Sequence, residues 1–293
     1  MENAHMKQKY EILEEKFAKF TNKRYAVALN SGTSALHLAL LSLGIGKGDE
    51  VIVPDFTFVA CAFAVTYTGA KPVFVDCGPD MLIDPKLIEA KITAKTKAIM
   101  PVHLYGRRCN MRAIMKIAKR HKLKVIEDVS EAHGIKLSNS DIAIYSLQSS
   151  KIINSQEGGV LVTNKKEIVD KVVHLKGLSN DGNYYHDVIG FNYRMPNAIA
   201  ELALKSLKNY KKNIKKRNKI AKNRGFKCDV AWVTVMLVKQ RDEVLRINKE
   251  SNCKTKYRCT FKPMTSLPMY KGQKTGKWAK FFSEHGIVIP IVL

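Results

Sequence analysis

The sequence predicts an α/β fold with a mostly parallel β-sheet, and three observations support this prediction. Short apolar runs alternate along the chain with longer segments whose apolar residues recur at helical spacing. The apolar runs lack the polar–apolar alternation of a half-exposed strand, as expected for strands that are covered on both faces. Glycine, proline and aspartate separate the segments. This order of elements is typical of helices packed on a parallel sheet.

The individual elements follow from these patterns. An amphipathic helix is expected over residues 7–20, then a strand at 25–29, and a turn that opens a helix ending at Gly44 or Gly46. The later elements predicted for this region are strand 50–53, helix 60–68, strand 71–75, helix 84–92, strand 98–101, helix 110–121, and strands 124–127, 142–147 and 159–163.

A different region follows a basic segment. A strand at 232–238 and a helix near 242–250 predict a small α+β domain at the C-terminal end. The boundary falls near residues 205–228. We therefore predict a large domain over residues 1–208 and a small, abbreviated domain over residues 209–293.

The composition excludes several classes of protein. Of the 293 residues, 45% are hydrophobic and 26% are charged, which is ordinary globular composition. The longest largely apolar run, residues 230–238, is far shorter than the ~20 residues that a membrane helix needs. The charged N-terminal segment has no apolar core of a signal peptide. Six cysteines without a C-x-x-C pair indicate reduced thiols in the cytoplasm and no metal site.

The charge is strongly basic and unevenly distributed. Fifty Lys and Arg against 26 Asp and Glu give a net charge of +24, and eleven of the basic residues lie within 205–227. This stretch predicts an amphipathic helix with a basic outer face. A solvated helix face explains it most simply, and contact with a nucleic acid or a sugar-nucleotide phosphate is the alternative. Aromatic residues are not interleaved as in a single-strand binding platform, so a nucleic-acid partner is not expected.

Three segments at predicted strand ends contain residues suited to catalysis or to phosphate binding. Gly32-Thr33-Ser34 opens a helix, where backbone N–H groups and hydroxyls can hold a phosphate. Asp128 ends one strand, and Lys151 follows another. Each has an ordinary explanation when taken alone, because Ser, Thr and Asp often cap helices and a loop lysine is usually solvated.

Together these residues fit pyridoxal phosphate. That cofactor needs a lysine to bond covalently to its aldehyde and an acid to keep its pyridine nitrogen protonated. It also needs a helix N-terminus for the phosphate and an aromatic residue to stack on the ring. Lys151, Asp128, the 32–34 turn and Phe58 supply these four parts.

Several segments, in the same order, give the sequence a specific likeness to a known family. They are SGTSALHLALLSLGIGKGDEVIVPDFTFVA, TGAKPVFVD, TKAIMPVHLYG, VIEDVSEAHG and GFNYRMPNAIAELAL, together with the serine–lysine–EGG stretch. The chain resembles the sugar-nucleotide aminotransferases of the DegT/DnrJ group, in their perosamine-synthase-like branch. The resemblance implies the aspartate-aminotransferase type of fold (PLP fold type I) for the large domain.

The resemblance also implies roles for individual residues around the cofactor ring. Lys151 would be the Schiff-base lysine and Asp128 the partner of the pyridine nitrogen. Glu131 would lie near the phenolic oxygen of the cofactor, and Phe58 would stack on its ring.

Further residues are implied for the phosphate and the substrate. Ser146 with Thr33 and Ser34 would hold the phosphate, and Asn192 would reach the site of a neighbouring subunit in a homodimer. Three residues are weaker candidates for substrate contacts: His103, His186 and Arg194.

The sequence departs from the family pattern in places that concern the substrate more than the cofactor. By the resemblance the chain is shortened at both ends, the segment 134–141 is short, and Gln156 stands where a glycine is expected. The predicted function is a pyridoxal-phosphate-dependent aminotransferase that transfers an amino group, with glutamate as donor, to a nucleotide-linked 4-keto-6-deoxy sugar. A catalytically impaired cofactor- or sugar-nucleotide-binding relative stays open as the alternative, and a nucleic-acid-binding protein is a more distant one.

Overall fold

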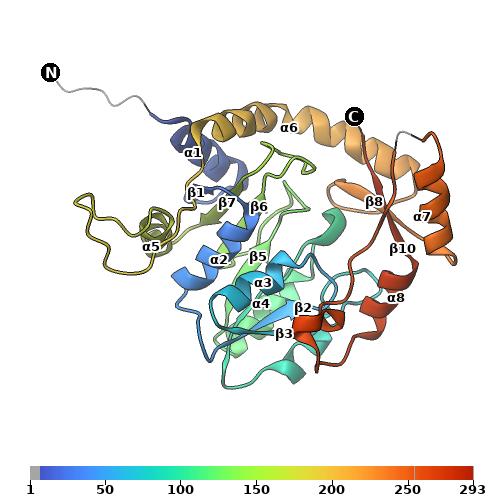
Figure 1. Ribbon diagram of the computed structural model, residues 1–293, viewed down its shortest axis with the longest axis horizontal. Coiled ribbons are helices and arrows are strands. Elements are labelled where there is room, and N and C mark those ends of the chain that lie inside the picture. The colour runs from blue at the N-terminus through green and yellow to red at the C-terminus, as the bar shows by residue number, and fades with distance from the viewer. Residues whose placement is uncertain (1–6, 254, 293) are drawn as a thin grey trace.

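A twisted seven-stranded sheet forms the centre of the molecule in the computed structural model, which describes residues 7–253 and 255–292 (Figure 1). Residues 1–6 of the predicted first domain lie outside the described part of the chain. The strand order is β1-β7-β6-β5-β4-β2-β3. The strands are β1 (Tyr25–Leu29), β2 (Glu50–Pro54), β3 (Lys71–Val75), β4 (Thr96–Ile99), β5 (Lys124–Asp128), β6 (Ile142–Ser146) and β7 (Gly159–Thr163).

The sheet is mostly parallel, as predicted. Neighbouring strands from β6 through β5, β4 and β2 to β3 pair in parallel, whereas β7 is antiparallel to both β1 and β6. Because parallel strands end at the same edge, the residues that follow β5 and β6 are brought together there.

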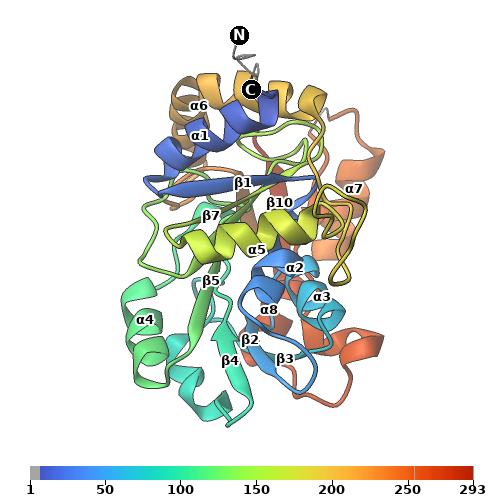
Figure 2. The same ribbon diagram turned by 90° about the vertical axis from the view of Figure 1, so that its left-hand side faces the viewer.

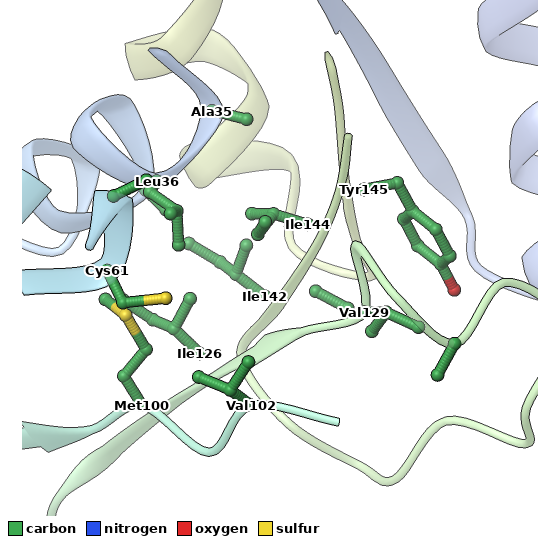
Figure 3. Close-up of a cluster of buried hydrophobic side chains, with 14 of the residues drawn as sticks. Ala35, Leu36, Cys61, Met100, Val102, Ile126, Val129, Ile142, Ile144 and Tyr145 are labelled. Carbon is green, nitrogen blue, oxygen red and sulfur yellow. The ribbon is translucent and has the colours of Figure 1, made fainter. Parts of the chain in front are cut away.

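Helices cover both faces of this sheet. In the first part of the chain they are α1 (Lys9–Thr21), α2 (Gly32–Ser42), α3 (Ala60–Tyr67), α4 (Met111–Arg120) and α5 (Lys166–Lys176). In β6, Ile144 points toward Leu36 of α2, and the adjacent Tyr145 points to the other side (Figure 3). There Tyr145 meets Phe17 of α1, with ring centres 5.0 Å apart. Successive strand residues face opposite sides, so α1 and α2 cover opposite faces.

The core between α2, α3 and the central strands contains closely packed branched side chains. Leu36, Cys61, Ile126 and Ile142 are at most 2% exposed and lie together in Figure 3. Burial of each leucine or isoleucine side chain of this set contributes roughly 1.5–3 kcal/mol to folding. This packing fixes the ends of β5 and β6 relative to the start of α2.

A second, smaller sheet lies beside the first region, on the right of Figure 1. Its antiparallel order is β8-β10-β9, and α7 and α8 pack on it. The bounds are β8 (Val233–Leu237), α7 (Arg241–Glu250), β9 (Arg258–Cys259), α8 (Lys277–His285) and β10 (Gly286–Pro290). The strand and helix predicted at 232–238 and 242–250 are therefore present.

One long helix, α6 (Asn197–Asn223), connects the two regions and lies against α1 along one edge of the molecule (Figure 2). The predicted boundary after residue 208 falls inside this helix, so the division into domains stays a prediction. Arg217 of α6 is not part of a wholly solvated face, because its guanidinium donates to the Trp232 carbonyl at 3.0 Å.

Two local predictions were incomplete. The helix predicted at 84–92 consists of two short 3₁₀ turns, Pro85–Leu87 and Glu89–Lys91. A segment this short gains few helical hydrogen bonds for the cost of nucleation. Helix α5 was not predicted, although Ile168 and Val172 form its buried side.

None of the helices within residues 7–253 and 255–292 combines the length and apolar character that a membrane span requires.

Candidate active site

A cavity of about 420 Å³ opens where β5 and β6 end and α2 begins. Its walls come from both regions of the molecule. The first region contributes Ser31, Gly32, Thr33, Leu36, Phe58, Ala60, Val102, Asp128, Ser130, Glu131, Ser146, Gln148, Ser150, Lys151 and Glu157, and the second region adds Trp232, Arg258 and Phe261. The cavity thus brings together the lysine, the acid and the helix start that the sequence placed at strand ends.

Lys151 reaches the cavity from the loop after β6. Its side chain is 13% exposed, and its Nζ lies 3.8 Å from Oε1 of Glu131. The same Nζ lies 4.0 Å from the centre of the Trp232 ring. The amine is therefore held between a carboxyl group and an aromatic face, largely out of water.

Asp128 is the last residue of β5 and is 5% exposed. Its Oδ1 accepts a hydrogen bond from the Ser130 amide at 2.9 Å, and its Oδ2 accepts one from the Cys61 thiol at 3.1 Å. These two donors fix the plane of the carboxylate. A fixed carboxylate of this kind is the partner that a protonated pyridine nitrogen requires.

Glu131 is 4% exposed and faces Lys151. Burial raises the pKa of Glu131 to about 7, against the attraction of Lys151 and a hydrogen bond from the Tyr105 amide. The carboxyl group therefore changes its protonation near neutral pH. Such a group can accept or donate a proton in a closed site.

The start of α2 packs tightly on the end of β6. A Cβ at Gly32 would lie only 2.9 Å from the Cβ of Ser146, so only glycine allows this approach. Ser31 caps the helix, and its Oγ accepts from the Ser34 amide at 3.0 Å. The helix start with its positive dipole end therefore faces the cavity beside the Ser31, Thr33 and Ser146 side chains.

These residues fit pyridoxal phosphate by the chemistry of their side chains. A buried amine, a fixed carboxylate and a glycine-tight helix N-terminus line one cavity, which is the donor set that the cofactor's aldehyde, ring nitrogen and phosphate require. Lys151, Asp128 and the 31–33 turn would hold these three groups.

Two of the predicted cofactor residues lie in other positions. Ser34 does not line the cavity, because its hydroxyl donates to Asn30 Oδ1 at 2.6 Å within the helix cap. Asn192 is exposed on the loop before α6, and its backbone oxygen accepts from Asn30 Nδ2 at 3.3 Å. Phe58 does line the cavity and is 55% exposed there.

None of the three candidate substrate residues lies in the cavity. His103 is fully buried, and its Nε2 lies 3.1 Å from Glu127 Oε2 while its Nδ1 accepts from the Cys109 amide at 3.0 Å. His103 thus has a structural role in this chain, and a substrate contact is not supported. His186 and Arg194 are exposed on the loop formed by residues 177–196, and neither side chain lines the cavity.

Several residues that line the cavity were not predicted from the sequence. Trp232, Arg258 and Phe261 come from the second region, and nothing in their spacing connects them with Lys151. Cys61 was not among the predicted site residues, yet its thiol donates a hydrogen bond to Asp128. Ser31 could have been found, because a serine immediately before a predicted helix is a strong cap signal.

The sequence profile of the DegT/DnrJ/EryC1/StrS aminotransferase family matches residues 3–292. The chain belongs to this family. The predicted family and the aminotransferase class are thereby confirmed.

Individual relatives agree with this assignment. A GDP-perosamine synthase of Escherichia coli O157:H7 is 40% identical over 281 residues, covering 88% of this chain and 77% of its own length. A second GDP-perosamine synthase, of Caulobacter vibrioides, is 45% identical, covering 71% of this chain. The match spans 58% of the Caulobacter protein's length.

Solved structures of the family share the fold. DesV of S. venezuelae superposes with a TM-score of 0.90 at 30% identity, covering 98% of this chain and 84% of that one. NtdA of Bacillus subtilis, solved with the bound cofactor PMP, gives 0.82 at 28% identity and covers 97% and 73%. The predicted fold and the pyridoxal-phosphate type of cofactor are confirmed as those of the family.

Proposed function

We propose that the chain transfers an amino group from glutamate to the keto carbon of a nucleotide-linked 4-keto-6-deoxy sugar. The observation that supports this most is the meeting of Lys151, Asp128 and the α2 start in one cavity. The names of the relatives, GDP-perosamine synthase among them, support a nucleotide-linked sugar as the acceptor.

Pyridoxal phosphate, when bound, supplies an aldehyde for covalent capture of amines and a ring that withdraws electrons from the attached carbon. Lys151 would hold the cofactor covalently through its Nζ. When that amine is free, it would lie where it can take up the proton of the donor's α-carbon and return it. Its partly desolvated position beside Trp232 keeps water away from that proton transfer.

Asp128 would act on the pyridine nitrogen of the bound cofactor. Its carboxylate, fixed by the Ser130 amide and the Cys61 thiol, would keep a proton on that nitrogen. A cofactor protonated there would stabilise negative charge at the reacting carbon. Lys151 and Asp128 would have the same roles in the amination of the keto sugar.

A turnover assay tests this function directly. Purified protein is supplied with pyridoxal phosphate, glutamate and, one at a time, a panel of GDP-, UDP- and dTDP-linked keto sugars. We expect 2-oxoglutarate and an amino sugar to form in equal amounts with at least one 4-keto-6-deoxy sugar. A protein that binds the cofactor but turns over no sugar with any amino donor would support the impaired-relative alternative instead.

We also propose that the active unit is a homodimer in which Asn192 completes the site of the other subunit. The loop 177–196 that holds Asn192 exposes apolar side chains, among them Tyr184 at 89% and Ile189 at 87%. Exposed apolar residues clustered on one loop indicate a protein–protein contact. Two-fold symmetry would use the same loop twice.

Complementation tests this assembly. Lys151→Ala and Asn192→Ala are each expected to be nearly inactive, and refolding them together should restore activity. About half of the dimers would be mixed and each would have one intact site, so about a quarter of the parent activity should return. A monomer in sedimentation at micromolar concentration, or no recovery, contradicts the shared site.

We further propose that the enzyme works in the cytoplasm. All six cysteines are free thiols in the structure, and three of them, Cys61, Cys77 and Cys109, are buried. Reduced thiols are typical of cytoplasmic proteins. Fractionation of the native cells with an antibody against the chain tests the location.

A further inference from the structure

We propose that Trp232 is a positioning residue for Lys151: its indole ring holds the lysine amine in the cavity, and its N–H fixes the backbone next to that lysine. The inference rests on the proposed function, because it concerns the same lysine. It adds a residue that neither the sequence motifs nor the family assignment point to. The contacts of Trp232 on both sides support it.

On the cavity side, Trp232 makes two separate contacts with the lysine loop. The Nζ of Lys151 lies 4.0 Å from the ring centre, within the range of a cation–π interaction. The indole Nε1 donates to the carbonyl of Ser150, the residue before Lys151, at 2.7 Å. One side chain therefore contacts both the amine of Lys151 and the backbone of the residue before it.

On the other side, the chain around Trp232 is held firmly to the first region. The Gly106 carbonyl accepts hydrogen bonds from the Asp229 and Val230 amides at 2.9 and 3.0 Å. Gly106 has a φ of +77°, and a Cβ there would lie 1.6 Å from the Val230 carbonyl oxygen. The backbone of residues 229–230 thus occupies the space that a side chain at position 106 would need.

The same segment is also held from α6. Arg217 donates to the Trp232 carbonyl at 3.0 Å, and Asn218 Oδ1 accepts from the Ala231 amide at 2.8 Å. Trp232 itself is only 8% exposed. Since its backbone is anchored on two sides, the ring has a fixed place over the amine and does not merely fill space.

The contact with Trp232 matters when the Lys151 amine is not bonded to the cofactor. A free Lys151 amine has a competing partner in Glu131, whose Oε1 lies 3.8 Å away. An aromatic face attracts the ammonium more strongly when both are shielded from water. Trp232 therefore holds the amine between the two groups, in the cavity, where it can return to the cofactor aldehyde.

The test compares two variants at position 232. Trp232→Phe keeps an aromatic face but loses the bond to Ser150, and Trp232→Leu loses both. Trp278→Leu is the matched control, because Trp278 is the other tryptophan of the chain and stacks on Phe282 with ring centres 5.7 Å apart, in the same C-terminal region. Thermal melting and far-UV circular dichroism establish that each variant is folded.

The first readout needs no cofactor. Cofactor-free protein is treated briefly with an acylating reagent, and mass spectrometry measures acylation of Lys151 relative to the exposed Lys205. We expect Lys151 to react about five- to tenfold faster in Trp232→Leu than in the parent, as loss of a shielded cation–π contact implies. Trp232→Phe should restore most of the protection, and Trp278→Leu should match the parent.

The second readout is capture of the cofactor. Pyridoxal phosphate is added, the protein is reduced with borohydride, and the fraction of Lys151 that has acquired the cofactor is measured over time. We expect slower capture in Trp232→Leu than in Trp232→Phe. Equal acylation and equal capture in the parent and Trp232→Leu would overturn the proposal, as would an equal rise in Trp278→Leu, which indicates general loosening.

The two proposals fail in different ways. If the proposed function is wrong, the parent turns over no sugar, whether or not Lys151 captures cofactor, while the acylation contrast between Leu and Phe at position 232 can still be measured. If only the role of Trp232 is wrong, the parent captures cofactor and turns over sugar, and the Leu and Phe variants do not differ.

Discussion

The seven-stranded region and the three-stranded region contribute to the same cavity in different ways. The first supplies Lys151, Asp128 and Glu131 from the ends of adjacent parallel strands. The second supplies Trp232, Arg258 and Phe261, which reach the cavity because the segment before β8 is anchored on Gly106 and α6. Strand order determines the first set, and docking of one region on another determines the second.

This difference shows which part of an active site is readable from one sequence. Parallel strands place their carboxyl ends side by side in any sequence that forms them, so polar residues just after β5 and β6 must meet. No comparable rule predicts where a residue such as Trp232 will lie. The chemistry of the cofactor thus belongs to the first region, and the shape and charge around it depend on the second.

Lys151→Ala gives the largest expected effect and tests the first region. Removal of the amine takes away both the covalent attachment and the group that moves the proton, so turnover should fall by at least about 10³-fold. Borohydride reduction should no longer fix pyridoxal phosphate on the chain. Covalent fixation at another lysine, with turnover retained, would contradict the role of Lys151.

Asp128→Asn should have the next largest effect. A neutral amide cannot keep the pyridine proton, so kcat should fall by about 10²- to 10³-fold while the cofactor still binds. Cys61→Ala is the informative control, since it removes only the 3.1 Å thiol contact and should cost far less. Near-normal turnover in Asp128→Asn would exclude this role for the carboxylate.

Most of the first region could be predicted from the sequence, down to strands with the predicted bounds. Tyr25–Leu29, Lys71–Val75 and Gly159–Thr163 agree residue for residue, because at least the last four residues of each strand are buried and the strand ends at a turn signal. The direction of β7 was not given by its apolar run, because a strand buried on both faces has the same composition in either orientation.

The site was predictable to the extent that its residues follow strand ends. Lys151, Asp128, Gly32, Thr33 and Ser146 line one cavity, and their roles stay predictions. Ser34 and His103 do not line it, because their polar atoms are used in local hydrogen bonds. Those bonds depend on side-chain geometry that a sequence pattern does not specify.

Glu131→Gln tests how strongly burial in the cavity changes the protonation of Glu131. The pKa of Glu131 is about 7 in the folded chain, whereas the ordinary pKa of a glutamate is 4.5. Between these values the folded protein retains a proton that the unfolded chain has released. The stability of the parent should therefore fall as pH rises from 4.5 to about 7, by up to about 3 kcal/mol.

The variant lacks this titration, so its free energy of unfolding should vary less over the same window. Urea unfolding of both proteins at pH 5 and pH 8 measures the difference. Glu201→Gln, which removes an exposed carboxylate 3.3 Å from Lys205, is the control and should follow the parent. Parallel pH profiles for the parent and Glu131→Gln would contradict the raised pKa.

Arg258→Gln has the smallest expected effect and addresses the second region alone. Arg258 lies on β9, pairs with Val288 of β10 and lines the cavity, where its charge also lowers the pKa of Glu131 against the effect of burial. A cation at the cavity wall that neither holds the cofactor nor moves a proton should bind the anionic groups of a substrate equally before and during reaction. Loss of such uniform binding raises KM by about tenfold and leaves kcat within about twofold.

Steady-state kinetics with glutamate and with the sugar nucleotide, each varied in turn, identify which substrate Arg258 contacts. Arg258→Lys keeps the charge and should recover part of the lost affinity, although a lysine cannot bind an anion in a bidentate manner. Lys262→Gln removes an exposed charge that does not line the cavity and should leave both KM values unchanged. A fall in kcat with no change in either KM would place Arg258 with the reacting groups, and the separation of roles between the two regions would then be wrong.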